Sequence, residues 1–371
     1  MWFTGMGFLP RWFFIKNLKR FCADGSRIEG TESVCRPDRC VVNLMRPCRP
    51  DRFRKQGIIY LTVPRLRGMA VWCEKWEDSI MPEIIIATES GSDLPEEIVR
   101  QYQIEVAPMH VIMNNVSYDD GHFPIDMVFD YFEETGKIPT TSAVNVQEYV
   151  DFWNDIRSRH PGCIIYHFTY SSNASSTHQH AVAARDQENF RDLYIIDTKS
   201  VSGGCTAHIE ACCRMLEKRK NSITDSAAAG ALAEEFQALA DRIECNFIPA
   251  TLDYLRAGGR VSNGAYIAAN VLRLKPLIEI NREGFLVATK KFRGSMDKIT
   301  DKFMQMFLQR HHLNHDTLYL MYGPGLSQSI LDRMREIALE NGFQRTVYVM
   351  TGCTISCHGG KGAIGLAGVT E

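Results

Sequence analysis

The sequence predicts an α/β protein of two domains, the first built on a parallel α/β/α sheet and the second on a mixed α/β sandwich. From Met81 onward, short apolar runs alternate with helix-length segments, which is typical of parallel strands joined by crossover helices. Residues 281–284 form a Gly-containing turn between two apolar runs and indicate a hairpin in the second domain. The length of 371 residues is enough for about two domains.

The first strand–helix unit shows how each element is recognised. Residues 84–88 are an apolar run suited to a buried strand, and Ser92 or Asp93 then caps a helix whose first turn holds Glu96 and Glu97. The same alternation predicts strands at 104–113, 162–169, 193–196 and 246–250, with helices at 126–135, 175–189, 203–218 and 226–243.

A hairpin changes this pattern in the last part of the chain. Its strands are predicted at 274–280 and 285–289. They are followed by helices at 295–309 and 327–341 and by strands at 317–322, 346–350 and 363–369. We therefore assign residues 81–244 to the first α/β domain and residues 245–371 to the second.

The overall composition excludes several classes of protein. With 45% hydrophobic and 23% charged residues and a formal net charge of −2, the chain is neither a disordered, a collagen-like nor a coiled-coil sequence. No run approaches the roughly 20 uninterrupted apolar residues of a membrane-spanning helix. The N-terminal apolar stretch also lacks the features of a secretory signal. We therefore expect a cytoplasmic protein with reduced thiols.

Residues 1–80 differ from the rest of the chain. They hold 15 Lys and Arg against 8 Asp and Glu, a net charge of +7, whereas the remaining residues carry 27 against 36. Our preferred interpretation is that Met81 is the biological start and that this basic, Cys- and Trp-rich extension is not native or is disordered. Two alternatives are an arm that binds nucleic acid or a membrane surface, and a zinc module, which would be all-cysteine because the segment has no His.

Small hydroxyl residues gather in three loops, at 88–90, 140–142 and 171–177. Ligands of open α/β sheets bind beyond the carboxyl ends of the strands, so the loops after Thr88, Thr169 and Met350 form the natural site. Hydroxyls and helix amides can hold an anionic group there. The alternative is ordinary capping, with Thr141 and Ser175 as helix N-caps.

Other motifs are excluded by their context. Residues 360–365 fit G-x-G-x-x-G, but the six residues that follow leave no room for a dinucleotide fold. The sequence contains neither a P-loop for ATP nor the G-x-S-x-G of an α/β-hydrolase. Cys353, Cys357 and His358 lie close together, yet they have no partner cluster, so we expect buried thiols and no metal.

Several motifs, taken in order, resemble those of the DegV family. They cover residues 85–94, 108–120, 140–143, 171–177, 196–200, 254–262, 275–276, 293 and 355–365. Each motif is weak alone, but their order along residues 84–369 is specific. The chain departs from the family pattern at Glu89, where Asp is usual, at Ala143 and Val144, where Gln-Pro is usual, and at Ser176, where Gly is usual.

The resemblance implies two α/β domains that hold one long-chain fatty acid between them. The family often serves as the carrier subunit, non-catalytic alone, that presents the carboxylate to a separate ATP-dependent fatty acid kinase. By resemblance, Thr141 and Ser175 contact the carboxylate with His358 close by, and Arg260 and Arg293 belong to the phosphotransfer complex. It implies no cofactor and no nucleic acid partner, and it allows transient membrane contact for lipid exchange.

Two other hypotheses stay open beside the carrier. The second domain resembles the substrate domain of dihydroxyacetone kinase, so His358 could hold a small carbonyl substrate in an enzyme. The basic residues 1–80 could instead make the chain an interaction module whose binding weakens steeply with salt. A carrier predicts a narrow apolar tunnel that ends at Thr141, Ser175 and His358, whereas the enzyme predicts a small polar pocket.

Overall fold

The computed structural model describes residues 82–219, 222–259 and 274–371, together with the backbone of five short strands between residues 13 and 42. The chain divides into two compact units, 1–80 and 81–371. In the first unit, β1 (Phe13–Phe14), β4 (Ser33–Arg36) and β5 (Arg39–Val42) form an antiparallel sheet, and β2 (Arg20–Phe21) pairs with β3 (Arg27–Ile28). The zinc hypothesis and the nucleic-acid or membrane hypothesis depend on side chains of residues 1–80, which lie outside the described residues.

The second unit begins with a four-stranded parallel sheet in the order β12-β11-β6-β7. Its strands are β6 (Ile84–Glu89), β7 (Glu105–Ala107), β11 (Ile164–Thr169) and β12 (Leu193–Asp197). The central strands are buried on both faces, which is why their sequence is a continuous apolar run instead of an alternating one. Ile85 and Ile165 face one helix layer, and Ile86 and Tyr166 face the other.

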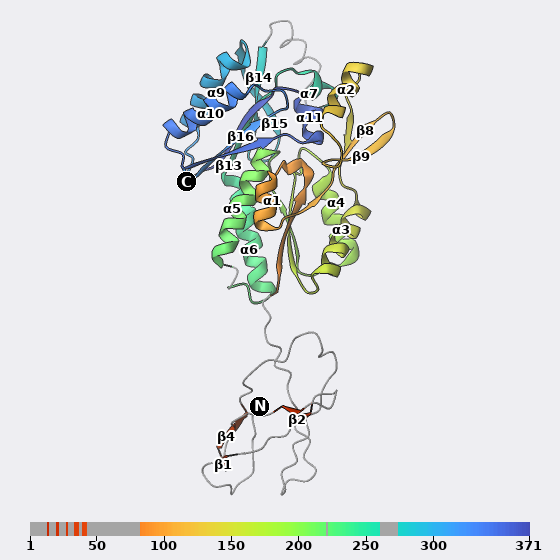
Figure 1. The fold of residues 1–371 in the computed structure, drawn as a ribbon, viewed down its shortest axis with the longest axis vertical. Coiled ribbons are helices and arrows are strands. Elements are labelled where there is room, and N and C mark those ends of the chain that lie inside the picture. Colours follow the sequence, from red (N-terminus) through yellow and green to blue (C-terminus); the bar gives the residue numbers. More distant parts are fainter. Residues whose placement is uncertain are drawn as a thin grey trace. The chain divides into compact units, whose positions relative to one another are not determined.

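Helices cover both faces of this sheet (Figure 1). One layer holds α3 (Val146–Arg159) and α4 (Thr177–Glu188), and the other holds α1 (Glu96–Tyr102), α5 (Gly203–Arg219) and α6 (Ser226–Leu239). The parallel α/β/α sheet predicted from the sequence is therefore confirmed.

The second sheet has six strands in the order β15-β14-β13-β18-β16-β17. They are β13 (Ile243–Ile248), β14 (Leu274–Ile280), β15 (Leu286–Arg293), β16 (Thr317–Tyr322), β17 (Arg345–Met350) and β18 (Ile364–Val369). Only β16 and β17 pair in parallel, so the sheet is mixed, as the sequence predicts. The predicted domain boundary at 244/245 falls inside β13.

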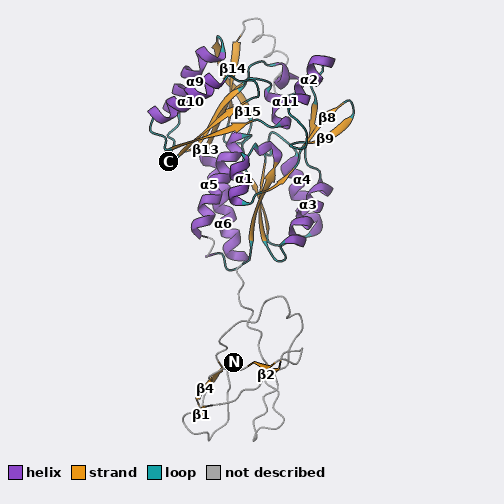
Figure 2. Ribbon diagram, in the orientation of Figure 1, coloured by secondary structure: helices purple, strands orange, loops and turns teal. Residues whose placement is uncertain are grey.

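Helix α5 packs between the two sheets. The helices α9 (Met296–Arg310) and α10 (Gln328–Glu340) pack on the second sheet in a core of their own (Figure 2). Helix α5 contacts β13, β16 and β18. Residues 203–210 are all buried. A Cβ on Gly204 would lie 1.9 Å from Ser200 Oγ and 2.9 Å from Cys245 Cβ, so glycine lets the helix approach the second sheet closely.

A third, small sheet was not predicted. It has the order β10-β8-β9, formed by β8 (His110–Met113), β9 (Val116–Asp119) and β10 (Thr140–Ser142). With α2 (Asp126–Thr135) it shares a core with α7 (Asp253–Ala257) and α11 (Cys353–Gly359). The strand predicted at 104–113 is wrong as a single element, because Pro108, which lacks an N–H donor, separates β7 from β8.

Across the described residues, no helix combines the length and the apolar character that are needed to cross a bilayer. The cysteines in this part of the chain are all buried and make no disulfide: Cys163, Cys205, Cys212, Cys213, Cys245, Cys353 and Cys357.

Candidate functional site

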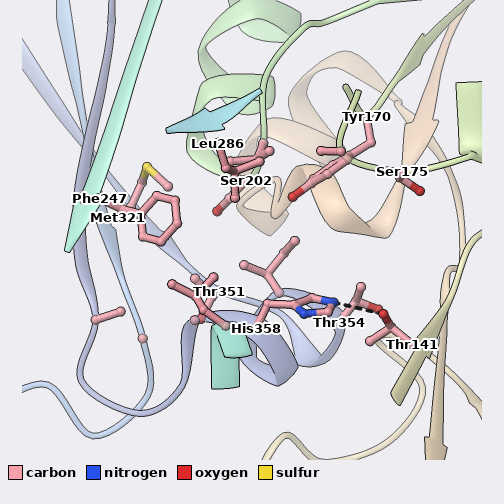
Figure 3. Close-up of a pocket in the computed structure, with 18 of the residues that line it drawn as sticks. Thr141, Tyr170, Ser175, Ser202, Phe247, Leu286, Met321, Thr351, Thr354 and His358 are labelled. Atoms are coloured by element: carbon pink, nitrogen blue, oxygen red, sulfur yellow. Dashed lines mark hydrogen bonds between the residues drawn. The ribbon is translucent and has the colours of Figure 1, made fainter. Parts of the chain in front are cut away.

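A cavity of about 190 Å³ opens between the loops of the first sheet and the second sheet (Figure 3). Since one buried water needs roughly 10–15 Å³ of such space, the cavity has room for about a dozen water-sized groups. Its lining residues come from the loops at the carboxyl ends of β7, β11 and β12, from β10, from α11 and from the second sheet. Of the three loops that the sequence predicts for a ligand, those after Thr169 and Met350 line the cavity, whereas the loop after Thr88 supplies none of the lining residues.

Three residues that the sequence predicts for the site line this cavity together. Thr141 lies on β10, Ser175 lies in the loop before α4, and His358 lies on α11. Thr141 Oγ1 is 2.9 Å from His358 Nε2, a hydrogen bond that joins residues 217 positions apart. Figure 3 shows Ser175 across the cavity from this pair. The fold therefore gathers the predicted head-group residues at one end of the cavity.

The capping alternative applies differently to the two hydroxyl residues. Thr141 caps no helix, because α3 is capped by Asn145, whose side chain and Glu148 form a capping box. Ser175 Oγ accepts a weak hydrogen bond of 3.3 Å from the N–H of Thr177 at the start of α4. Its hydroxyl hydrogen is still able to donate to a ligand, so a capping contact and ligand binding are compatible at Ser175.

Two buried carboxylates hold the N-terminus of α11. Asp93 Oδ1 accepts from the N–H of Gly352 at 2.8 Å, and Asp120 Oδ1 accepts from the N–H of Cys353 at 2.9 Å. The prediction that Ser92 or Asp93 caps the helix after it is wrong, since α1 has no side-chain cap and Asp93 binds α11 instead. These contacts position the helix that carries His358.

The environment of Asp93 disfavours its charged form. Burial raises the pKa of this carboxyl well above its usual value. The hydrogen bonds from the Ser202 hydroxyl, at 2.5 Å, and from Gly352 oppose the shift, and the nearby charge of Asp120 adds to it. Ser202 itself lines the cavity, so Asp93 connects the cavity wall to α11.

A second buried network supports the loop that carries Ser175. Glu89 is fully buried, and it accepts hydrogen bonds from the Tyr149 hydroxyl, from His167 Nε2 at 3.0 Å and from the N–H of Tyr170 at 2.7 Å. Trp153 Nε1 donates to His167 Nδ1 at 3.2 Å, so the proton of a neutral His167 lies on Nε2. Burial, followed by the charge of Glu89, raises the pKa of Tyr149 and keeps the phenol protonated.

The side of the cavity away from Thr141 and His358 is apolar. Figure 3 shows Phe247, Met321 and Leu286 together on that side. The apolar lining residues of this wall are Val201, Phe247, Leu255, Leu286, Met321 and Ile364. The sequence did not predict them for the site, because most of them belong to ordinary apolar strands or helices and only the fold brings them together.

Gly258 also shapes the site, although the sequence marks it only as part of a motif. Its φ of −74° is open to any residue, but a Cβ there would lie 2.1 Å from His358 Nδ1. The absent side chain therefore leaves room for the imidazole ring. A substitution at this position would displace His358 from the cavity wall.

Of the two predicted arginines, Arg293 does not line the cavity. Arg260 lies outside the described residues, and Arg293 is the exposed last residue of β15.

In the described part of the chain, no group of three His, Cys, Asp or Glu residues is arranged to hold a metal ion. Burial raises the pKa of Cys353 to about 12 and also raises the pKa of Cys357, so both stay thiols at neutral pH.

Solved structures share this fold. A DegV family protein from Thermus thermophilus, described by its fatty acid binding, matches with a TM-score of 0.64 and 21% identity over 78% of this chain and 100% of that protein. A DegV family protein from Eubacterium eligens, loaded with heptadecanoic acid, matches with a TM-score of 0.66 and 19% identity over 78% of this chain and 100% of that one. A stearic acid-binding protein from Eubacterium ventriosum matches with a TM-score of 0.63 and 22% identity over 77% of this chain and 97% of that protein.

Sequence comparison gives the same relationship. A DegV domain-containing protein of Caldanaerobacter subterraneus is 27% identical over 295 residues, 77% of this chain and 98% of that protein. One from Clostridium acetobutylicum is 28% identical over 306 residues, with the same coverage of both chains. The family profile described as "Uncharacterised protein, DegV family" matches residues 83–371. The chain therefore belongs to the DegV family, as the motifs in its sequence indicate.

Proposed function

We propose that this chain binds one long-chain fatty acid in the cavity, with the carboxylate held by Thr141 and Ser175 beside His358. The observation that carries the proposal is the division of the cavity into a hydroxyl-rich end and an apolar end. The fatty acids described for the Thermus and Eubacterium proteins support the same ligand class.

The energetics of such a ligand suit this division. Burial of an acyl chain gains about 0.8 kcal/mol per methylene, or on the order of 10 kcal/mol gross for a dozen of them. Burial of the carboxylate without hydrogen bonds would offset much of that gain. Hydroxyl donors at one end satisfy the carboxylate, and the remaining wall removes the chain from water.

We further propose that the chain is a non-catalytic carrier that offers the carboxylate to a separate ATP-dependent fatty acid kinase. In that reaction a carboxylate oxygen would bond to the terminal phosphorus of ATP, and ADP would leave. Arg260 and Arg293 are the residues that we assign to the contact with the kinase. The exposure of Arg293 is compatible with this role, because a guanidinium at the surface can approach a phosphoryl group on a partner.

The apolar wall favours this proposal over an enzyme for a small polar substrate. A dihydroxyacetone-like ligand on His358 would leave Phe247, Leu286 and Met321 facing water inside the protein. An acyl chain covers the same side chains.

Native mass spectrometry of the purified full-length chain tests the proposal. We expect a co-purified adduct of fatty-acid mass, at one ligand per chain, that disappears when the protein is denatured. The double variant Thr141→Val/Ser175→Ala should retain less of the adduct. A folded protein that carries no adduct and does not take up added palmitate or oleate would contradict fatty-acid binding. Acyl phosphate formation with a supplied kinase and ATP tests the carrier role separately.

A further inference from the structure

One hydroxyl in the cavity has no partner among the described residues. Thr354 lines the cavity on α11 and is 3% exposed, and its Oγ1 is buried without a hydrogen bond to any described group. Other hydroxyls nearby are bonded: Thr351 Oγ1 lies 2.8 Å from Ser356 Oγ, and Ser202 donates to Asp93. Thr354 therefore differs from the hydroxyl groups around it.

An unpaired hydroxyl is unfavourable in this position. A buried polar group without a partner loses its hydration without replacement. Threonine within a helix commonly satisfies its hydroxyl by donating to a backbone carbonyl one turn earlier. Thr300 on α9 does this, with Oγ1 2.7 Å from the carbonyl oxygen of Met296. Thr354 makes no such bond, so its hydroxyl remains available to a molecule that enters the cavity.

Thr354 lies at the end of the cavity that holds Thr141 and His358. Residues four apart share one face of a helix, so Thr354 and His358 both face the cavity, about 6 Å apart along the axis. Figure 3 shows Thr354 beside the Thr141–His358 pair. A carboxylate has two oxygens that together accept about four hydrogen bonds, more than Thr141 and Ser175 can donate.

We propose that the Thr354 hydroxyl is a third polar contact of the cavity and hydrogen-bonds an oxygen in the carboxyl half of the acyl ligand. This inference rests on the proposed fatty-acid binding and extends it to a specificity-determining residue. The oxygen belongs either to the carboxylate or to a hydroxyl group on the first carbons of the chain. A ligand without an oxygen at this point leaves Thr354 unpaired and binds more weakly, because a site built around a hydrogen bond discriminates against analogues that lack it.

The test compares Thr354→Val with the wild-type full-length chain after removal of lipid. Valine keeps the shape of threonine and removes only the hydroxyl. We expect the thermal midpoint of the ligand-free protein to rise by about 2 °C, because an unpaired buried hydroxyl is lost. Titration with palmitic acid and with 3-hydroxypalmitic acid should show affinity about three- to tenfold weaker for one or both.

The two acids distinguish the sources of the oxygen. An equal loss for both places the carboxylate on Thr354, and a loss confined to 3-hydroxypalmitic acid places a chain hydroxyl there. Thr354→Ser, which retains a hydroxyl, should keep the wild-type affinities. Thr300→Val is the matched control, because it removes a buried and bonded threonine hydroxyl on α9 and should leave both affinities unchanged.

Failure of this inference is separable from failure of the proposed function. Wild-type protein that binds palmitic acid, together with unchanged affinity of Thr354→Val for both acids, overturns only the role of Thr354. Wild-type protein that binds neither acid overturns fatty-acid binding and this inference with it. If Thr354→Val does not fold, a loss of affinity in Thr354→Ser greater than threefold also counts against the inference, because serine can still donate.

Discussion

The two sides of the cavity are built in different ways. The loops of the first sheet, with β10, supply hydroxyls at Thr141, Ser175 and Ser202, whereas the strands of the second sheet supply apolar side chains such as Phe247 and Met321. Two of these hydroxyls, those of Thr141 and Ser175, lie in short loop motifs that resemble the family. The apolar wall is assembled from strands far apart in the sequence. Motifs in this sequence therefore pointed to the proposed carboxylate contacts Thr141 and Ser175, whereas no local pattern pointed to the apolar wall.

The two sides also depend on different interactions. Behind the hydroxyl loops, Glu89 and Asp93 are buried and bonded to several donors at once. The apolar wall depends on close packing, as at Gly203, whose Cβ would lie 2.4 Å from Met321 Cγ. We expect that removal of one buried polar group on the hydroxyl side lowers stability or affinity sharply. Substitutions on the apolar side should change the preference for ligands gradually.

The largest expected effect is at Glu89. Glu89→Ala removes the acceptor for three donors, the buried side chains of Tyr149 and His167 and the half-buried N–H of Tyr170. The Tyr149 hydroxyl can still pair with Thr177 Oγ1, 2.6 Å away. At about 1–3 kcal/mol for each of the other two donors, the free energy of unfolding should fall by about 2–6 kcal/mol. Urea unfolding measures it. The control is Glu97→Ala, at an exposed site on α1, which should change stability by less than about 0.5 kcal/mol. Equal stability of the two variants would show that the loops do not depend on this network.

A second effect concerns α5, the helix that supports both sides. Burial lowers the pKa of His208 to about 4 from an ordinary value of 6.5, while the hydrogen bond with the carbonyl of Phe236 and the charges of Asp197 and Asp241 oppose the shift. Between pH 4 and pH 6.5, His208 thus binds fewer protons in the folded protein than in the unfolded chain. Stability should fall as the pH drops from about 6.5 to about 4, by up to about 3 kcal/mol.

The variant His208→Gln isolates this contribution. Glutamine can donate to the Phe236 carbonyl but does not titrate, so its unfolding free energy should depend less on pH in this range. Urea titrations of both proteins between pH 4 and 7 provide the comparison. Parallel pH profiles would exclude His208 as a source of acid sensitivity. Glu210 and Asp93 titrate in both proteins, so they do not affect the difference.

Much of the fold was predictable because it follows local patterns. The strands 274–280 and 317–322 and the helix 126–135 have the bounds that the sequence predicts. The small sheet was missed because its strands are short: β9 is mostly exposed and β10 has only three residues. No hydrophobic period can be recognised over so few positions.

The candidate site was predictable only in part, for a related reason. Thr141, Ser175 and His358 were predicted because each lies in a motif that resembles the family, and all three line the cavity. Asp93 was assigned to the helix that follows it, since a cap is the local explanation for an acid before a helix. Its actual partner, the N–H of Gly352, is 259 residues away. The unpaired hydroxyl of Thr354 likewise exists only once the helix is packed.

A third effect tests the hydroxyl end directly. Thr141→Val and Ser175→Ala each remove a proposed donor to the carboxylate, and hydrogen bonds to charged groups contribute about 1.5–3 kcal/mol. Affinity for palmitic acid should fall at least about tenfold in each variant, whereas affinity for hexadecanol should change little. Isothermal titration with both ligands checks this. A similar loss for the alcohol would assign the two residues to the shape of the cavity instead of carboxylate recognition.

The smallest effect tests the apolar end. Met321 lines the wall and is 4% exposed, so Met321→Ala opens space at the far side from His358. Each additional methylene that enters this space gains about 0.8 kcal/mol, so the preference for longer over shorter fatty acids should increase by about 1–2 kcal/mol. Competition among saturated acids of increasing length measures the shift.

Met334→Ala on α10 is the matched control, since Met334 is fully buried in the separate core between α9, α10 and the second sheet. It should lower stability without a change in chain preference. If both variants shift the preference equally, general loosening of the domain explains the change, and the apolar wall does not set the length of the chain.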